Sequence, residues 1–239
     1  MKQLELLYEG KSKLIYATDC SERVVVRFKD DATAFYNIKR AKIENKGKMN
    51  CAISSNILAF LEANGINTHF VEQIDETSQL CRVVEHLPFE VIVRNVIAGS
   101  MAKRLGIDEG VVPENTIFDL CLKDEELGDP LINDHHAVAL GLATYEELVK
   151  IYEISARVNT LLTELYAGVG IRLVDFKVEF GRSSDGELVL ADELTPDTCR
   201  IWDIETGECM DKDRFRRDLG RVRETYQEVA SRLCNALNK

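Results

Sequence analysis

Charged and apolar side chains alternate in the segment Leu173–Phe180, LVDFKVEF. Because successive side chains of a strand point to opposite faces, we expect Asp175, Lys177 and Glu179 on one face, roughly 7 Å apart from i to i+2. Two carboxylates and an ammonium are costly to shield from water without partners or a metal ion. A functional site explains this row, and a solvated hairpin with surface ion pairs is the alternative. The other face is expected to join the core through Val174, Phe176, Val178 and Phe180.

A second strand, Glu187–Glu193, follows the turn Ser183–Gly186, whose Asp-Gly pair is typical of a β-hairpin. The acidic end of this strand is therefore expected beside Glu179. Mg²⁺ takes one or two protein carboxylates and fills its other positions with water and phosphate oxygens. One carboxylate from each strand would suit a Mg²⁺ ion that carries nucleotide phosphates.

The N-terminal segment Tyr8–Lys13, YEGKSK, carries Lys11 and Lys13 on one strand face directly after Gly10. Glycine lets a backbone approach phosphate closely, and two ammonium groups suit a polyphosphate. The spacings of the Walker loop and of the dinucleotide-binding fingerprint are both missing. The alternative is simply the basic end of a strand.

Two arginines are candidates for binding an anion. Arg94 lies in an apolar strand, Glu90–Val96, and Ser100 lies six residues later at a predicted helix start. Helix N-termini bind anions, and the arginine fork can hold a phosphate or carboxylate in bidentate fashion. Arg200 lies in a loop anchored by Pro196, where it either binds an anion or neutralises the acidic strand end.

Other polar clusters carry less information. The charged run Lys123–Glu126 is expected to be a solvated turn, and no Ser-His-Asp or Cys-His arrangement can be assigned. The sequence therefore contains no recognisable pairing of a nucleophile with a base.

The composition favours a globular protein that acts on small molecules. At 239 residues and 45% hydrophobic content the chain can bury a large core, in one domain or two tightly joined lobes. A net charge of -11 argues against a nucleic-acid or anionic-membrane partner, and no apolar run approaches the ~18 residues of a membrane span. Seven scattered cysteines without a CxxC pair fit reduced thiols, so we expect a cytoplasmic protein.

The periodicity predicts a mixture of strands and helices. Helices are expected over about Asn50–Ala63, from Thr144 onward after a capping box with Glu147, and over about Asp213–Leu237. The mixture lacks strict βαβ alternation, which predicts an α+β fold with mainly antiparallel sheets. The first third reads as a meander of short strands, at Leu4–Tyr8, Lys13–Thr18, Arg23–Phe28, His69–Ile74 and Leu80–Glu85.

A connector at Val84–Pro88 is the expected hinge between two lobes. The N-terminal lobe, residues 1–86, would cover a nucleotide, and the larger lobe, residues 87–239, would carry the substrate and metal sites and the C-terminal helix. Adenine would bond to backbone groups of this connector, at Glu85 and Leu87.

Five collinear segments resemble the phosphoribosylaminoimidazole-succinocarboxamide synthase (SAICAR synthetase) family. The resemblance extends over nearly the whole chain, and its strength comes from the shared order of motifs that are individually weak. The segments are Tyr8–Lys13, Phe28–Phe35, Glu90–Ser100, Val174–Phe180 and Asp192–Trp202.

The resemblance implies a two-lobed α+β fold similar to kinase-like and ATP-grasp nucleotide folds. We also expect the protein to form a homodimer. The resemblance also implies a ligase that uses ATP and Mg²⁺ to join L-aspartate to the carboxylate of carboxyaminoimidazole ribonucleotide (CAIR). Gly10, Lys11 and Lys13 would hold ATP phosphates, and Glu179 and Asp192 would ligate Mg²⁺.

For the ribonucleotide, the resemblance implies a seat formed by Arg94, Ser100 and Arg200, chiefly for its phosphate. Lys177 and Asp175 would lie close to the reacting carboxylate, with Lys177, Asp175 and Arg200 as the catalytic set.

The chain departs from the family where Tyr36-Asn37 replaces an Asn-Gly that often follows the early Ala-Phe. This departure affects the expected contacts of that loop. A small-molecule kinase and a nucleotide-sensing module are the alternative functions.

Overall fold

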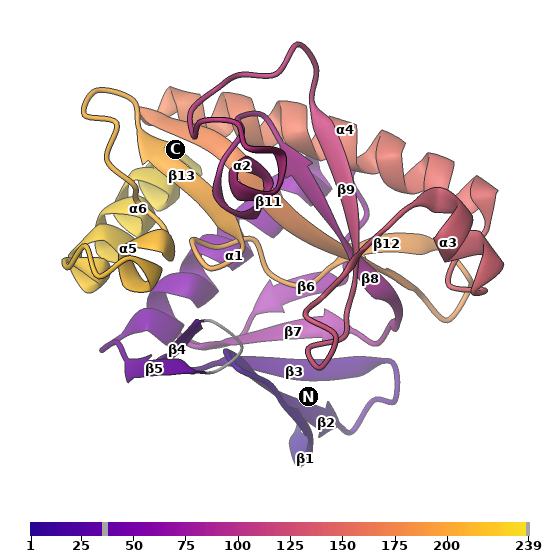
Figure 1. Ribbon diagram of the computed structural model, residues 1–239. Helices are drawn as coiled ribbons and strands as arrows, with labels where there is room; N and C mark the ends of the chain where they lie inside the picture. Colours follow the sequence, from indigo (N-terminus) through magenta and orange to yellow (C-terminus); the bar gives the residue numbers. More distant parts are fainter. Residues whose placement is uncertain (35–37, 238–239) are drawn as a thin grey trace.

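The computed structural model of the chain describes residues 1–34 and 38–237. Antiparallel sheets and helices mix without βαβ alternation, so the α+β prediction is confirmed (Figure 1). Tyr36 and Asn37, where the early loop departs from the family, lie outside the described residues. None of the described helices combines the length and apolar character needed to cross a membrane.

The N-terminal sheet runs in the order β1-β2-β3-β7-β6 and is packed against α1 (Lys46–Ala63). Its predicted strands are confirmed to within about two residues, except that the last ends at Arg82 and not at Glu85. The bounds are β1 (Gln3–Glu9), β2 (Lys13–Thr18), β3 (Arg23–Phe28), β6 (Phe70–Gln73) and β7 (Ser78–Arg82). A separate hairpin of β4 (Asp31–Ala34) and β5 (Lys39–Lys42) precedes α1.

A second antiparallel sheet follows the order β10-β9-β8-β11-β12. Strand β12 pairs with residues 179–182 of β11, and β13 pairs with residues 171–176 of the same strand. The long helix α4 (Tyr145–Gly168) lies along this sheet (Figure 1) and begins with the predicted capping box between Thr144 and Glu147. The bounds are β8 (Glu85–Arg94), β9 (Ile117–Leu122), β10 (Leu131–Ile132), β11 (Ile171–Arg182), β12 (Leu188–Ala191), β13 (Cys199–Asp203), α2 (Gly99–Leu105) and α3 (Asp134–Ala139).

The predicted hinge differs from the structure, because β8 already begins at Glu85 and pairs with β11 from there. Only Val83 and Val84 separate β7 from β8. Most of the expected connector is therefore sheet, and the boundary at residue 86 falls inside a strand.

The C-terminal helix is interrupted, contrary to the prediction. α5 (Asp213–Arg216) and α6 (Val222–Leu237) are separated by a turn in which Asp218, Gly220 and Arg221 have positive φ angles. A right-handed helix cannot continue through such residues. Leu219, which the predicted helix would include, lies in this turn with 49% exposure. In α6 the apolar residues Tyr226, Val229 and Leu233 are buried, and the helix packs against α1.

Strand β11 contains an irregularity that the simple alternation did not predict. Against β13 its register shifts between Leu173 and Asp175, so two residues of β11 occupy the space of one. Leu173 therefore shares the main core with Phe176, while Val174 packs in a separate small cluster with Val96, Ala98 and Trp202. The predicted apolar face is correct from Phe176 onward and wrong at Val174.

Candidate active site

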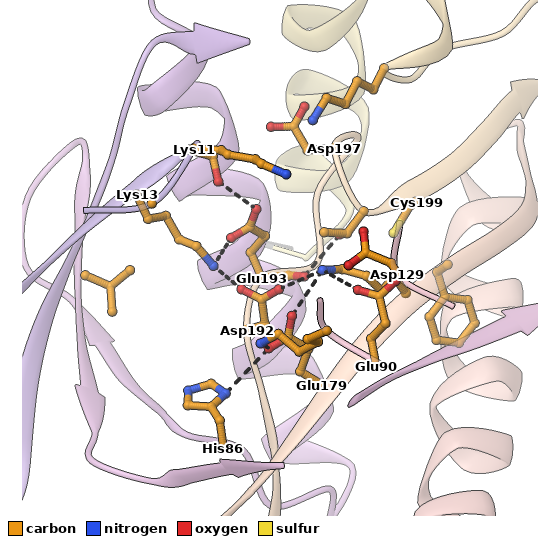
Figure 2. Close-up of a pocket in the computed structure, with 18 of the residues that line it drawn as sticks. Lys11, Lys13, His86, Glu90, Asp129, Glu179, Asp192, Glu193, Asp197 and Cys199 are labelled. Atoms are coloured by element: carbon orange, nitrogen blue, oxygen red, sulfur yellow. Dashed lines mark hydrogen bonds and ion pairs between the residues drawn. The ribbon is translucent and has the colours of Figure 1, made fainter. Parts of the chain in front are cut away.

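A cavity of about 860 Å³ lies between the two sheets (Figure 2). Side chains of β2 and β3 line it from the N-terminal sheet, and side chains of β8 and β11 line it from the second sheet. The structure brings ten of the twelve residues predicted for the site to this cavity, namely Gly10, Lys11, Lys13, Arg94, Ser100, Asp175, Lys177, Glu179, Asp192 and Arg200.

The two others, Glu85 and Leu87, do not line the cavity. Side chains of β8 alternate, and His86 and Glu90 face the cavity while Leu87 is buried in the core. The side chain of Glu85 instead lies 3.5 Å from Arg182. Around the expected connector, the residues that line the cavity are Val83, Val84 and His86.

Lys177 lies among the carboxylates of Glu90, Glu179 and Asp192, which are labelled in Figure 2. Its Nζ lies 3.1 Å from Glu90 Oε2, 3.1 Å from Glu179 Oε1 and 3.5 Å from Asp192 Oδ2. Burial alone would lower the pKa of Lys177, but Asp192, Glu179 and Glu90 outweigh it and raise this pKa. The solvated-hairpin alternative is therefore excluded for this face. Glu90 was not predicted, although a lone carboxylate in an apolar strand was a usable signal.

Lys13 brings a second ammonium to the same cluster from the N-terminal sheet. It pairs with both Asp192 and Glu193, and these carboxylates raise its pKa in spite of burial. Burial opposes ionisation of Asp192, yet Lys13 and Lys177 hold its pKa well below the usual value. Lys13 and Lys177 are thus charged. Their ammonium groups could bind a phosphate if another cation neutralised the carboxylates.

The run Lys123–Glu126 is largely exposed and enters a turn, as predicted, but Lys123 and Glu125 also line the cavity. Lys123 Nζ lies 2.5 Å from Glu179 Oε2, and Lys11 Nζ lies 2.6 Å from Glu125 Oε1. The loop between β9 and β10 thus contacts the N-terminal sheet across the cavity. The composition of the run could not predict these ion pairs, because the two residues of each pair are more than fifty positions apart in the sequence.

The donor set fits a magnesium ion that brings phosphate oxygens with it. Glu179 pairs in register with Ala191, so Asp192 follows directly on the neighbouring strand. Two carboxylates are what Mg²⁺ needs from a protein when phosphates complete its shell. No group of three or more metal-binding side chains occurs within residues 1–34 and 38–237.

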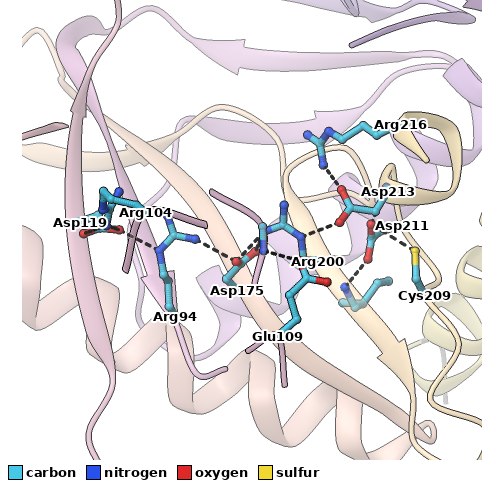
Figure 3. A network of polar contacts seen from close by, with 12 residues as sticks. Arg94, Arg104, Glu109, Asp119, Asp175, Arg200, Cys209, Asp211, Asp213 and Arg216 are labelled. Carbon is cyan, nitrogen blue, oxygen red and sulfur yellow. Dashed lines mark hydrogen bonds and ion pairs between the residues drawn. The ribbon is translucent and has the colours of Figure 1, made fainter. Parts of the chain in front are cut away.

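The other end of the cavity holds a row of alternating charges (Figure 3). Arg94 donates from Nε to Asp119 (2.8 Å) and from Nη1 to Asp175 (3.0 Å). Arg200 donates from Nη1 to Asp175 (2.7 Å) and from Nε to Asp213 (2.9 Å). Burial raises the pKa of Asp175, and the two arginines oppose that effect. Asp119 and Asp213 were not predicted, and each holds one guanidinium in place.

Each arginine has one nitrogen outside this row, because within the described part of the chain no hydrogen bond involves Nη2 of Arg94 or Nη2 of Arg200. Nη2 of Arg200 lies beside Gly99, where a Cβ would come within 2.5 Å of it. Gly99 also has a φ of +58°. A side chain at position 99 would strain the left-handed backbone and would collide with the Arg200 guanidinium. The next residue, Ser100, also lines the cavity. Within the described residues, the hydrogen bonds of Arg200 go to Asp175 and Asp213 and not to the acidic strand end at Asp192 and Glu193.

Comparisons with known proteins agree on one family. The family model for SAICAR synthetase matches residues 6–233. A phosphoribosylaminoimidazole-succinocarboxamide synthase from Fusobacterium nucleatum is 58% identical over 98% of both chains. The crystal structure of the synthase from Ehrlichia chaffeensis has a TM-score of 0.94 at 44% identity, over 96% of this chain and 98% of the other. A SAICAR synthetase solved in complex with ADP has a TM-score of 0.93 at 44% identity, over 96% and 97%.

These matches extend over both sheets and the cavity between them. The segments whose order suggested the resemblance all lie within the matched range. The chain belongs to the SAICAR synthetase family.

Proposed function

We propose that the chain is an ATP-dependent ligase that joins L-aspartate to the carboxylate of CAIR, giving SAICAR, ADP and phosphate in de novo purine (IMP) biosynthesis. The observation that carries the proposal is the cavity itself, where a lysine–carboxylate end faces an arginine end. A nucleotide polyphosphate suits the first end, and a phosphorylated ribonucleotide suits the second. A related SAICAR synthetase was solved with ADP, which supports the use of ATP here.

The reaction needs ATP because a carboxylate is a poor electrophile. Transfer of the γ-phosphoryl group to the CAIR carboxylate makes an acyl phosphate and releases ADP. The aspartate amine then forms the amide bond, phosphate leaves with the bonding electron pair, and the amine loses a proton. Such a transfer depends on in-line positioning and charge neutralisation more than on a protein nucleophile.

On the phosphate side, Lys11 and Lys13 would bind ATP phosphates beside Gly10, and Lys177 would stabilise the charge that develops on the transferring group. Glu179 and Asp192 would hold Mg²⁺. When bound, the ion would neutralise phosphate oxygens and release the two carboxylates from their lysine partners.

On the substrate side, Arg94, Ser100 and Arg200 would seat the ribonucleotide. Asp175 holds both guanidinium groups, so in this assignment it orients them and keeps their Nη2 atoms directed at the substrate. We keep two lobes as the description of how the nucleotide and substrate sides divide, with the boundary moved from residue 86 to Val83 and Val84, between β7 and β8.

We also propose a cytoplasmic homodimer. All seven cysteines are free thiols, as a reducing compartment would favour. Analytical ultracentrifugation tests the dimer independently of activity.

Release of ADP tests the function directly. The purified protein with ATP, Mg²⁺ and CAIR should release ADP at a substantial steady rate only when L-aspartate is added. Steady release without aspartate would favour a small-molecule kinase, and binding of ATP without any turnover would favour a nucleotide-sensing module.

A further inference from the structure

Lys212 is a cation in the cavity that the assignments above leave unused. It lies at the start of α5, where its backbone N–H donates to Pro196 O at 3.0 Å, and its side chain lines the cavity. Burial lowers its pKa; the charge of Asp197 opposes this effect, and Arg216 and Lys46 act in the same direction as burial. The protein therefore keeps this ammonium in a place that disfavours its charge.

The carboxylates near Lys212 are already committed to other groups. Asp197 pairs with Lys46 and accepts hydrogen bonds from Asn50 and from the Tyr226 hydroxyl, at 2.9 Å each. Glu193 pairs with Lys13. Within the described part of the chain, Lys212 Nζ has no ion pair or hydrogen bond.

This sets Lys212 apart from the other buried lysines at the cavity, because Lys13 and Lys177 each have carboxylate partners within 4 Å. An ammonium that burial disfavours and that contacts no carboxylate directly is stabilised when a ligand brings an anion to it. A cavity group in this state indicates a subsite for an anionic ligand.

The anion can be identified by elimination, on the basis of the proposed function. The polyphosphate is assigned to the end with Lys11 and Lys13, and the ribonucleotide phosphate to the end with Arg94 and Arg200. L-Aspartate brings two carboxylates besides its reacting amine, and these have no assigned partner. Lys212 lines the same cavity as Arg200 and Arg216, and these two arginines are linked through Asp213.

We propose that Lys212 binds a carboxylate of L-aspartate and thereby selects a dicarboxylic amino acid as the acceptor. Arg216, which also lines the cavity, is held by Asp213 at 2.6 Å and adds positive charge to the same wall. The ribonucleotide phosphate has the same chemistry of recognition, so the test must separate the two ligands.

Steady-state kinetics of Lys212→Met provides that separation, since methionine keeps the length and apolar packing of the stem. The KM for L-aspartate should rise roughly tenfold or more, as for loss of one charge-assisted hydrogen bond. The KM values for ATP and CAIR should stay within about twofold, and Lys212→Arg should restore much of the loss. Lys150→Met, at an exposed position of α4, is the matched control and should behave as wild type.

A second readout distinguishes recognition from a structural role. Wild-type protein should prefer L-aspartate to both L-asparagine and L-aspartic acid α-amide, and Lys212→Met should lose most of its preference over one of them. An unchanged KM for aspartate, or a rise in the KM for CAIR instead, would overturn the proposal while leaving the ligase function intact. If the wild-type protein shows no aspartate-dependent release of ADP, the proposed function fails first and this inference fails with it.

Discussion

Asp192 combines an unusual backbone with a central charge. Its φ is +67°, and its carboxylate lies between Lys13 and Lys177. Asparagine and aspartate tolerate this left-handed conformation better than other residues that carry a Cβ. Asp192→Asn is therefore the substitution that removes the charge with the least backbone strain.

If Asp192 holds Mg²⁺, Asp192→Asn should lower kcat by more than about tenfold, equivalent to roughly 1.4 kcal/mol of barrier. Raising the Mg²⁺ concentration should recover part of the activity. Kinetics across a magnesium titration measures both effects, and wild-type turnover with an unchanged metal requirement would exclude Asp192 as a ligand.

Gly99 allows a test of the substrate end. Gly99→Ala adds a Cβ that would meet Arg200 Nη2 at 2.5 Å, so the guanidinium must move. We expect affinity for the ribonucleotide to fall by about tenfold or more while ATP affinity stays nearly constant, because misplacing one charge-assisted hydrogen bond costs on the order of 1.4 kcal/mol or more. Calorimetry with each ligand measures the two affinities.

Gly106→Ala is the matched control. Gly106 also has a positive φ, +65°, but no atom lies within 4 Å of the added Cβ. It should therefore share the backbone strain without the loss of affinity. Equal losses in both variants would mean that strain in α2, and not displacement of Arg200, causes the effect.

At the scale of elements, the loop between β9 and β10 links the two sheets through Lys11 and Glu125. The same lysine is assigned to ATP, so the nucleotide must displace Glu125 from it. Both side chains are substantially exposed, and such an ion pair contributes only about 0–1 kcal/mol. The contact is weak enough for ATP to replace it.

Glu125→Gln should accordingly lower the KM for ATP by up to about fivefold, since the nucleotide no longer competes with a carboxylate. The KM for CAIR should not change. Glu126→Gln removes the same charge from the next, exposed residue and serves as the control. The competition model fails if the KM for ATP rises, or if both variants lower it equally.

At the scale of the whole molecule, the pair of Lys46 and Asp197 joins α1 to the loop before β13. The side chains are only 1% and 4% exposed. Burial would raise the pKa of Asp197, but Lys46 and Lys212 outweigh it, and the pKa lies below the usual range. The stability that this carboxylate contributes is therefore present above the ordinary aspartate pKa of ~3.9 and is lost as the pH falls below it.

Lys46→Met leaves the Asp197 carboxylate buried without its main counter-charge, and we expect a loss of about 3–5 kcal/mol at pH 7. The pKa of Asp197 should rise in the variant, so its deficit relative to wild type should shrink as the pH is lowered toward 4. Urea denaturation over this pH range measures it. Lys48→Met, which breaks an exposed pair with Glu76, should cost no more than about 1 kcal/mol. A deficit in Lys46→Met that is constant with pH would contradict the assignment.

The sequence by itself determined most of the strands, the helices and the residues that reach the cavity. Local rules suffice for these features. Alternation predicted that Asp175, Lys177 and Glu179 leave the core together, and a capping box predicted where α4 begins. The order of five motifs indicated the family, because motif order does not depend on how the elements pack.

Tertiary structure alone decided which charges meet. Lys177 faces Glu90, Lys11 faces Glu125, and Lys212 is left without a carboxylate partner in the described structure. It also decided the bulge that turns Val174 away from the main core. Each of these outcomes depends on groups distant in sequence that fold into contact, and spacing along the chain carries no information about such contacts. The energy of a buried charge depends on its neighbours in space, so the roles of the carboxylates and lysines could be assigned only once the two sheets were placed together.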